Sequence, residues 1–287
     1  MKIEDVKKIC VAGAGNMGHQ IALLCALSGY ETFCFDLSAE QMNMAEAFVK
    51  GYLPDRVAKG KLSQEQAESA AARIRFTTIL EHAASGADFV IEAIIEKLQP
   101  KRELFEKLGQ LCPPHAVLAT NSSFIVSSQL ADVTGRPGQV CNMHFFNPAL
   151  VMKCVEVVKG PHTTAETATL TMELAHRLGK VPVLLQKEIY GFLVNRILAK
   201  ITEEALFLLD TGVASAEDID KAVVNALGHP LGPFRLMDLT GIDLAYHIGM
   251  ERYMQTSDPK EKPSPTVVEK YIKGEWGRKK SKGFYQY

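Results

Sequence analysis

One histidine and one glutamate lie in neighbouring apolar segments that could bring their side chains together. His144 stands near the end of the run 140–146, directly before a turn that Pro148 fixes, and Glu156 interrupts the run 154–158. A glutamate buried in an apolar strand is costly unless it has a partner, and His144 is the nearest cationic candidate. A carboxylate on one imidazole nitrogen fixes the tautomer and stabilises the imidazolium, so the pair could act as general base and acid. A core histidine and an internal hydrogen-bond acceptor without a catalytic role remain the alternative.

A glycine-rich turn follows the first predicted strand, 9–12. Its residues, Gly13-Ala14-Gly15-Asn16-Met17-Gly18, have the G-x-G-x-x-G pattern and lead into a predicted helix. The first glycine makes the tight turn, the second lets backbone approach a pyrophosphate, and the third lets helix and strand pack closely. Asp36 follows the second predicted strand, 31–35, where a carboxylate can bind ribose hydroxyls and repels a 2′-phosphate. The turn therefore predicts a site for NAD rather than NADP, and a different nucleotide is the alternative.

Two further groups of polar side chains occupy places where ligands bind in α/β proteins. Asn121-Ser122-Ser123 follows the predicted strand 117–119, so its hydroxyl groups emerge at the carboxyl end of a strand. The segment 191–196 places Asn195 at the start of a helix that has an apolar face. Both groups could instead consist of turn, helix-cap or helix-contact residues.

The elements that must position these side chains alternate between strand and helix in the first part of the chain. This alternation is typical of a parallel sheet with helices on both faces. The predicted strands are residues 9–12, 31–35, 89–91, 117–119, 140–146, 154–158 and 181–185. After residue 185 the sequence predicts no further strand, and apolar residues recur at helical spacing. The sequence predicts an α/β fold: a Rossmann-type doubly wound sheet over residues 1–186, followed by an all-α C-terminal domain over residues 187–287.

The composition is that of an ordinary globular protein. The 287 residues include 32 Lys and Arg against 33 Asp and Glu, so no net charge favours nucleic acid or a membrane surface. The six cysteines form no C-x-x-C pair, and no histidine cluster has metal-ligand spacing, so we expect no metal site. Because the charged N-terminus is neither a secretory signal nor a transit peptide, we expect a reduced, cytoplasmic location.

A series of short motifs along the chain resembles the 3-hydroxyacyl-CoA dehydrogenase family. The resemblance covers essentially the whole sequence in order, and its H-F-F-N-P and G-F-x-x-N-R elements are specific. The motifs are G-A-G-N-M-G at 13–18, Asp36, E-A-I-I-E at 92–96, A-T-N-S-S at 119–123, H-F-F-N-P at 144–148, M-K-C-V-E-V at 152–157, G-F-L-V-N-R at 191–196, Gly232-Pro233 and Gly283-Phe284-Tyr285.

The resemblance implies a role for each matching residue. His144 would be the general base that Glu156 orients, and Ser123 and Asn195 would hydrogen-bond the reacting oxygen of the substrate. The residues implied for NAD binding are Gly13, Gly15, Asn16, Met17, Gly18, Asp36, Glu96, Lys101, Asn121 and Asn147. The basic residues Arg56, Lys59 and Lys61 resemble the family's CoA-contacting helix, although a solvated charge run would look the same.

The implied reaction interconverts (S)-3-hydroxyacyl-CoA and 3-ketoacyl-CoA, with short chains such as 3-hydroxybutyryl-CoA and acetoacetyl-CoA, in a homodimer. The sequence departs from the family pattern at Ser122, which replaces Thr, at Tyr190, which replaces Pro, and at Ala149-Leu150, which replaces Val-Pro. Tyr190 precedes Asn195, so this departure bears on the substrate and not on the chemistry. The alternatives are a dehydrogenase of a free hydroxy acid, such as a sugar acid or carnitine, and an NAD-binding relative without turnover.

Overall fold

The computed structural model describes residues 1–287, except for the side chains of residues 255 and 256. The chain divides into two compact units, Met1–Leu193 and Val194–Tyr287. The boundary between these units lies seven residues after the predicted one, which follows residue 186. Residues up to 193 stay with the first unit because the Phe192 side chain is fully buried and the backbone amide of Leu193 donates to Glu156.

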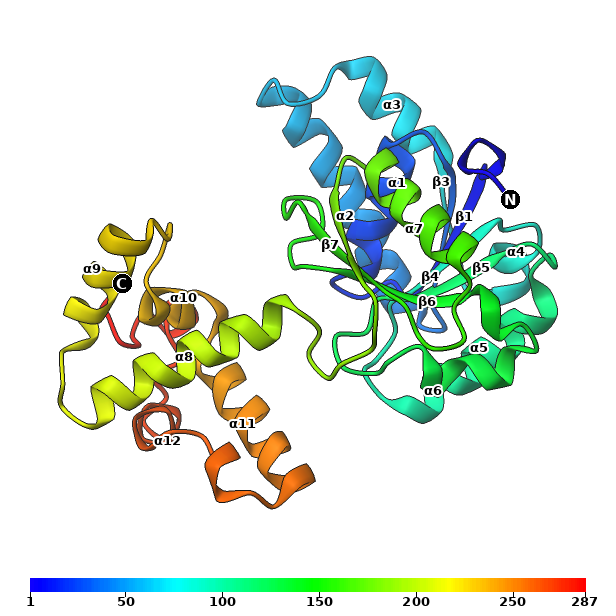
Figure 1. Ribbon diagram of the computed structural model, residues 1–287. Coiled ribbons are helices and arrows are strands. Elements are labelled where there is room, and N and C mark those ends of the chain that lie inside the picture. Colours follow the sequence, from blue (N-terminus) through cyan, green and yellow to red (C-terminus); the bar gives the residue numbers. More distant parts are fainter. The chain divides into compact units, whose positions relative to one another are not determined.

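The first unit contains one eight-stranded sheet with helices on both faces (Figure 1). The strands are β1 Lys8–Ala12, β2 Glu31–Phe35, β3 Ile74–Thr77, β4 Phe89–Glu92, β5 Val117–Thr120, β6 Val140–Phe145, β7 Cys154–Val158 and β8 Val181–Leu185. Their order is β3-β2-β1-β4-β5-β6-β7-β8. The first six positions have the strand order of the doubly wound dinucleotide fold, which confirms the predicted fold class.

Alternate residues of β1 face two different hydrophobic cores. Ile9 and Val11 belong to the core that α1, α2, α3 and α7 cover, and Cys10 and Ala12 belong to the core that α4, α5 and α6 cover. The helices of this unit are α1 Gly18–Leu27, α2 Ala39–Ala58, α3 Gln64–Arg73, α4 Leu80–Ala84, α5 Leu98–Leu111, α6 Ser128–Ala131 and α7 Ala165–Arg177, with 3-10 turns at Ile3–Asp5, Asp132–Thr134 and Pro137–Gln139. Both faces of β1 are thus buried, which explains its continuous apolar sequence.

Two features of the sheet differ from the prediction. The edge strand β3 has the sequence I-R-F-T and was not predicted, because four residues are too few for a clear strand pattern. β7 runs antiparallel to β6, although the alternating pattern predicts a parallel sheet. The connection over residues 146–153 holds no helix, and a parallel crossover needs a longer connection that usually includes one.

The second unit is entirely helical, as predicted. Its helices are α8 Val194–Asp210, α9 Ala216–Leu227, α10 Pro233–Thr240, α11 Ile242–Thr256 and α12 Pro265–Ile272, with 3-10 turns at Pro259–Glu261 and Arg278–Lys280. Its small core consists of Ala205, Leu206, Ile219, Phe234, Met237, Ile242 and Val267. Within the part of the chain that the structure describes, none of the helices has the length and apolarity to cross a bilayer.

Two buried aspartates tie the end of the chain to this helical unit. Asp220 accepts hydrogen bonds from the amides of Phe234 and Arg235 and from the Tyr285 hydroxyl, at 2.9, 3.0 and 2.8 Å. Burial, and then the bond to Asp220, raise the pKa of Tyr285, so the phenol stays a donor.

Asp238 binds the same end of the chain more directly. It accepts from the amides of Phe284 and Tyr285, both at 2.9 Å, and from the Tyr287 hydroxyl at 3.1 Å. A Cβ atom on Gly283 would lie 2.0 Å from the Asp238 carboxylate. The glycine of the C-terminal G-F-Y motif is therefore required by the packing of Asp238.

Replacing Asp238 by alanine should destabilise the helical unit by about 2–3 kcal/mol, because three partly buried donors lose their acceptor. The measurement is urea denaturation followed by the fluorescence of Trp276, the single tryptophan of the chain. Glu204→Ala, which removes an exposed carboxylate from α8, is the control. Equal stability of the two variants would contradict the role given to Asp238.

Candidate active site

The histidine and the glutamate predicted to pair lie opposite each other on β6 and β7. The antiparallel register aligns His144 with Glu156, so their side chains lie on the same face of the sheet. His144 Nδ1 lies 2.8 Å from Glu156 Oε2, and the two residues are 3% and 0% exposed. The buried carboxylate therefore has the partner that its burial requires.

The other two polar atoms of this pair also have contacts in the first unit. Glu156 Oε1 accepts the Leu193 amide at 2.9 Å, and Ser123 Oγ lies 3.0 Å from His144 Nε2. The rings of Phe146 and Phe192 lie 4.7 and 5.4 Å from the imidazole, measured between centroids. Because a carboxylate accepts at Nδ1, the neutral imidazole holds its proton there, and Nε2 is free to act as a base.

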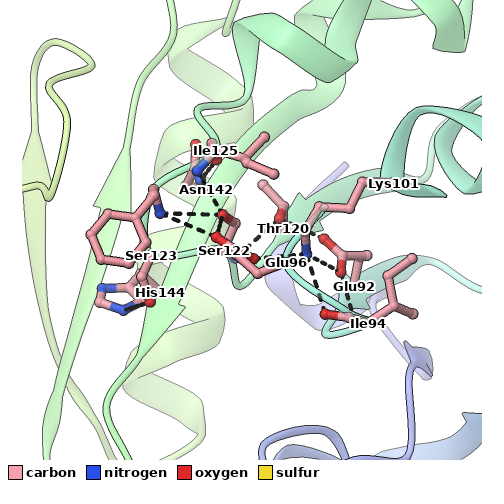
Figure 2. A network of polar contacts seen from close by, with 11 residues as sticks. Glu92, Ile94, Glu96, Lys101, Thr120, Ser122, Ser123, Ile125, Asn142 and His144 are labelled. Carbon is pink, nitrogen blue, oxygen red and sulfur yellow. Dashed lines mark hydrogen bonds and ion pairs between the residues drawn. The ribbon is translucent and has the colours of Figure 1, made fainter. Parts of the chain in front are cut away.

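The segment that presents Ser123 is fixed by bonds to both neighbouring strands. Asn121 Oδ1 accepts the backbone amide of Phe145, on β6, at 2.8 Å. The Ser122 amide donates to Thr120 Oγ1, on β5, at 3.1 Å, and the Ser122 hydroxyl donates to Glu96. Figure 2 shows Ser123 and His144 at one end of this polar network. The Asn121 side chain thus anchors the turn, in addition to any contact with a ligand.

The glycine turn between β1 and α1 has the geometry that its pattern predicts. Gly13 has a φ of +116°, and a Cβ atom there would lie 2.4 Å from the Ala93 carbonyl oxygen. A Cβ atom on Gly18 would lie 1.8 Å from the Gly13 carbonyl oxygen, whereas one on Gly15 would meet nothing within 4 Å. The first and third glycines are thus needed for packing, and the second leaves open space where a phosphate could approach the backbone.

Asp36 lies beside this turn, directly after β2. Its carboxylate accepts the amides of Ala14 and Ser38, both at 2.9 Å. Carboxylate oxygens accept more than one hydrogen bond each, so Asp36 keeps capacity for ribose hydroxyls. Burial, and then the Asp36 charge, raise the pKa of Cys34 to about 12, and burial lowers the pKa of His19. Both side chains are therefore neutral at pH 7, and the positive potential at the turn comes from backbone amides.

A buried lysine lies between two glutamates near the end of β4. Lys101, on α5, is 1% exposed, and its Nζ lies 2.5 Å from Glu92 and 3.3 Å from Glu96 (Figure 2). Glu96 is the most accessible of the three, because 40% of its side chain is exposed. The buried ammonium group of Lys101 is therefore paired with two carboxylates, and the motif E-A-I-I-E does not by itself indicate this pairing.

One cavity of the first unit, of about 1260 Å³, brings together most of the residues implied for the cofactor. Those along its wall are Gly15, Asn16, Met17, Asp36, Glu96, Lys101 and Asn121, and Ser123 lines it as well. Asn147 lies next to Asn16, whose amide nitrogen is 3.2 Å from Asn147 Oδ1. An anion-binding turn, a carboxylate for ribose and this volume fit a dinucleotide.

Four of the implied substrate residues lie outside that cavity wall. Arg56 stands at the end of α2 with its guanidinium 4.6 Å from the Tyr52 ring centroid. Lys59 pairs with Asp55, and Lys61 is exposed. Asn195 is on α8, in the second unit. A role of these four residues in substrate binding is supported by the family resemblance and not by a contact in the first unit.

The structure also places at the site several groups that the sequence patterns did not predict. Glu92 and Thr120 bond to each other beneath the cavity, and Phe192 and the Leu193 amide contact the His144–Glu156 pair. Glu92 ends the apolar strand sequence F-V-I-E, which is the same signal that identified Glu156. No sequence pattern indicates a backbone amide donor such as that of Leu193.

Comparison with known proteins matches both units to one family. The description "3-hydroxyacyl-CoA dehydrogenase, NAD binding domain" matches residues 8–189, and "3-hydroxyacyl-CoA dehydrogenase, C-terminal domain" matches residues 191–287.

Individual relatives share most of the chain. A protein of Bacillus subtilis named "Probable 3-hydroxybutyryl-CoA dehydrogenase" is 39% identical over 284 residues, 99% of this chain and 98% of that protein. The 3-hydroxyadipyl-CoA dehydrogenase of Escherichia coli is 37% identical over 99% of this chain and 59% of that protein. The crystal structure of (S)-3-hydroxybutyryl-CoA dehydrogenase PaaH1 from Ralstonia eutropha has a TM-score of 0.89 at 34% identity and covers 99% of both chains.

The matches span both units in chain order, and they agree with a glycine turn, the carboxylate of Asp36 beside it and a cavity that fit a dinucleotide. The chain therefore belongs to the 3-hydroxyacyl-CoA dehydrogenase family, and it is an oxidoreductase that acts on a CH–OH group with NAD as its cofactor.

Proposed function

We propose that the His144–Glu156 pair is the acid and base of this dehydrogenase and that short-chain CoA esters are its substrates. One observation supports the assignment above the others: Ser123 both lines the cofactor cavity and lies 3.0 Å from His144 Nε2. The basic nitrogen is thereby directed toward the wall of the cavity in which the nicotinamide end of NAD would lie.

The residues proposed to hold NAD are those of the glycine turn together with Asp36, Glu96, Lys101, Asn121 and Asn147. The bound cofactor would supply the hydride chemistry at C3: the oxidised form as acceptor from the hydroxyacyl group and the reduced form as donor to the ketone. The protein supplies orientation and charge, which the fixed carboxylates and backbone amides of this cavity provide.

Residues of the chain carry out the proton transfers. In oxidation, His144 Nε2 takes the proton of the 3-hydroxyl group, and Glu156 stabilises the resulting imidazolium through Nδ1–H. In reduction the imidazolium returns that proton to the oxygen. Ser123 donates a hydrogen bond to the reacting oxygen, and we assign Asn195 the same task from the second unit. The basic residues Arg56, Lys59 and Lys61 are proposed to contact the phosphates of CoA.

A Ser–His–Glu arrangement of this kind also occurs in enzymes of acyl transfer, so the two chemistries must be distinguished. Acyl transfer needs amide donors that point at an oxyanion beside the serine. Here the amides of Phe124 and Ile125, which follow Ser123, donate to the Ser122 hydroxyl at 3.3 and 2.7 Å. Because these two donors are already used, the arrangement favours proton transfer to a redox substrate.

The second unit is proposed to complete the substrate site and to form a homodimer. Ile197 and Phe207 of α8 are 55% and 58% exposed, so they offer apolar surface that a second copy could cover. We also propose a reducing compartment, because all six cysteines are free and burial raises the pKa of Cys112 to about 11.

The preference for short acyl chains is the finer part of the proposal. The Bacillus relative is named for a four-carbon substrate, whereas the Escherichia relative is named for 3-hydroxyadipyl-CoA at nearly the same identity. Tyr190 stacks on Phe124 of the cavity wall, with 5.1 Å between ring centroids, and it stands where many family members have proline. Aromatic groups here would reduce the space next to Ser123, which favours a small acyl group.

A steady-state panel of 3-ketoacyl-CoAs with acyl chains of different length tests this preference. We expect kcat/KM to be highest with acetoacetyl-CoA and NADH and to fall with chain length. The panel includes 3-oxoadipyl-CoA and the free acid acetoacetate. Higher kcat/KM with a longer ester would contradict the short-chain preference, and activity with free acids alone would support the alternative of a free hydroxy acid dehydrogenase.

Replacing His144 by glutamine should lower kcat by at least about a hundredfold, because general acid–base catalysis is lost. Binding of NADH, measured by fluorescence titration, should be unchanged, since His144 does not touch the glycine turn. His82→Gln, which alters an exposed histidine of α4, is the control. A kcat equal to that of the control would remove His144 from the proposed role.

Replacing Asp36 by serine should lower the preference for NAD over NADP by at least about tenfold, equivalent to about 1.4 kcal/mol. The reason is that the carboxylate repels a 2′-phosphate and binds the ribose hydroxyls. The measurement is the ratio of kcat/KM for the two cofactors, and Asp36→Asn separates loss of charge from loss of volume. An unchanged ratio in both variants would exclude the ribose assignment.

A further inference from the structure

Glu92 is a buried carboxylate that the mechanism above does not use. It is the last residue of β4, it has no exposed surface, and it accepts three hydrogen bonds. The donors are the Ile94 amide at 2.6 Å, Lys101 Nζ at 2.5 Å and Thr120 Oγ1 at 2.6 Å. A buried carboxylate with this many donors is fully satisfied and rigidly held, so it can fix the groups that surround it.

One of these donors connects Glu92 to the serine of the site. Thr120 pairs with Glu92 in the parallel register of β4 and β5, and its hydroxyl donates to the carboxylate. The same hydroxyl oxygen accepts the backbone amide of Ser122 at 3.1 Å. Since donation to a carboxylate makes a hydroxyl oxygen a better acceptor, Glu92 strengthens the bond that holds the turn before Ser123.

A second donor connects Glu92 to the cofactor cavity. Lys101 is fully buried, and Glu92 is its nearest anion, while the accessible carboxylate of Glu96 lies 3.3 Å away. Glu96 also accepts the Ser122 hydroxyl (Figure 2). Two separate contacts therefore lead from Glu92 to the turn 121–123, one through Thr120 and one through Lys101 and Glu96.

We infer that Glu92 is a positioning residue of this dehydrogenase. Through Thr120 it sets the position of Ser123 against His144, and through Lys101 it sets the groups that face the cofactor. The inference rests on the proposed function, because Ser123 and Lys101 have roles only in that reaction. It adds a residue that touches neither substrate nor His144.

The charge and the shape of Glu92 are both needed for this arrangement. In Glu92→Gln, the oxygen can face Ile94 and Lys101, but the amide nitrogen then points a donor at the Thr120 hydroxyl. If the amide is flipped, its nitrogen faces two other donors. Thr120→Val removes the hydroxyl with little change of volume and leaves Lys101 paired, whereas Thr120→Ser keeps the hydroxyl.

The test compares the unaltered protein with Thr120→Ser, Thr120→Val, Glu92→Gln and the double variant Glu92→Gln/Thr120→Val. Three quantities are measured: kcat for reduction of acetoacetyl-CoA, Kd for NADH by fluorescence, and hydrogen–deuterium exchange of peptides covering residues 121–125 without cofactor. Glu106→Gln, the same change at an exposed site on α5 outside the cavity, is the matched control.

Thr120→Val should lower kcat by about tenfold and speed exchange of the turn, while the Kd for NADH stays within about twofold. Thr120→Ser should restore both quantities. Glu92→Gln should lower kcat and also raise the Kd for NADH by about fivefold or more, because Lys101 loses its nearest anion. In the Glu92→Gln background, adding Thr120→Val should lower kcat by less than about twofold. The reason is that both substitutions break the same hydrogen bond, the one between Thr120 and Glu92.

The inference is overturned if Thr120→Val leaves kcat and exchange at the values of the unaltered protein. It is also overturned if Thr120→Ser is impaired as much as Thr120→Val, or if the two substitutions are fully additive, because either result indicates only a packing defect. Activity of the unaltered protein tests the proposed function separately. If that activity is absent, exchange of the turn and NADH binding still decide whether Glu92 positions these groups.

Discussion

The site depends on the burial of one carboxylate, that of Glu156. Removed from water, this group needs donors for both oxygens, and the fold supplies His144 Nδ1 from β6 and the Leu193 amide from the end of the first unit. To place that amide, Gly191 and Phe192 adopt positive φ angles of 73° and 48°. For a non-glycine residue this conformation costs about 1–2 kcal/mol. Burial of the Phe192 ring against His144 offsets that cost, so the segment that precedes α8 also orients the imidazole.

The sheet contains a second buried carboxylate that is bonded to a neighbouring strand. Glu92 and Glu156 are both fully buried glutamates on strands, and each binds a side chain of the neighbouring strand. The turn 121–123 lies between them, because Ser122 is bonded toward the Glu92 side and Ser123 toward His144. Two buried acids thus hold one short turn from opposite directions. This arrangement explains why so polar a segment, A-T-N-S-S, directly follows apolar strand residues.

Two of the departures from the family pattern, at Ser122 and Tyr190, leave the contacts of the His144–Glu156 pair in place. Ser122 in place of threonine keeps the hydroxyl that accepts the Ile125 amide and donates to Glu96. Tyr190 in place of proline adds a ring that stacks on Phe124. Neither change touches the contacts of His144.

The sequence by itself determined the features that depend on local pattern. The glycine turn, Asp36, the alternation of strands and helices, and the pairing of His144 with Glu156 all follow from spacing along one or two adjacent segments. Only the tertiary structure decided the edge strand β3, the antiparallel direction of β7 and the partners of Glu92, Lys101 and Leu193. The Leu193 amide lies 37 residues from Glu156 in the sequence, and no side-chain type signals such a donor. Contacts of this kind depend on strand register and on the path of the backbone, which residue periodicity does not specify.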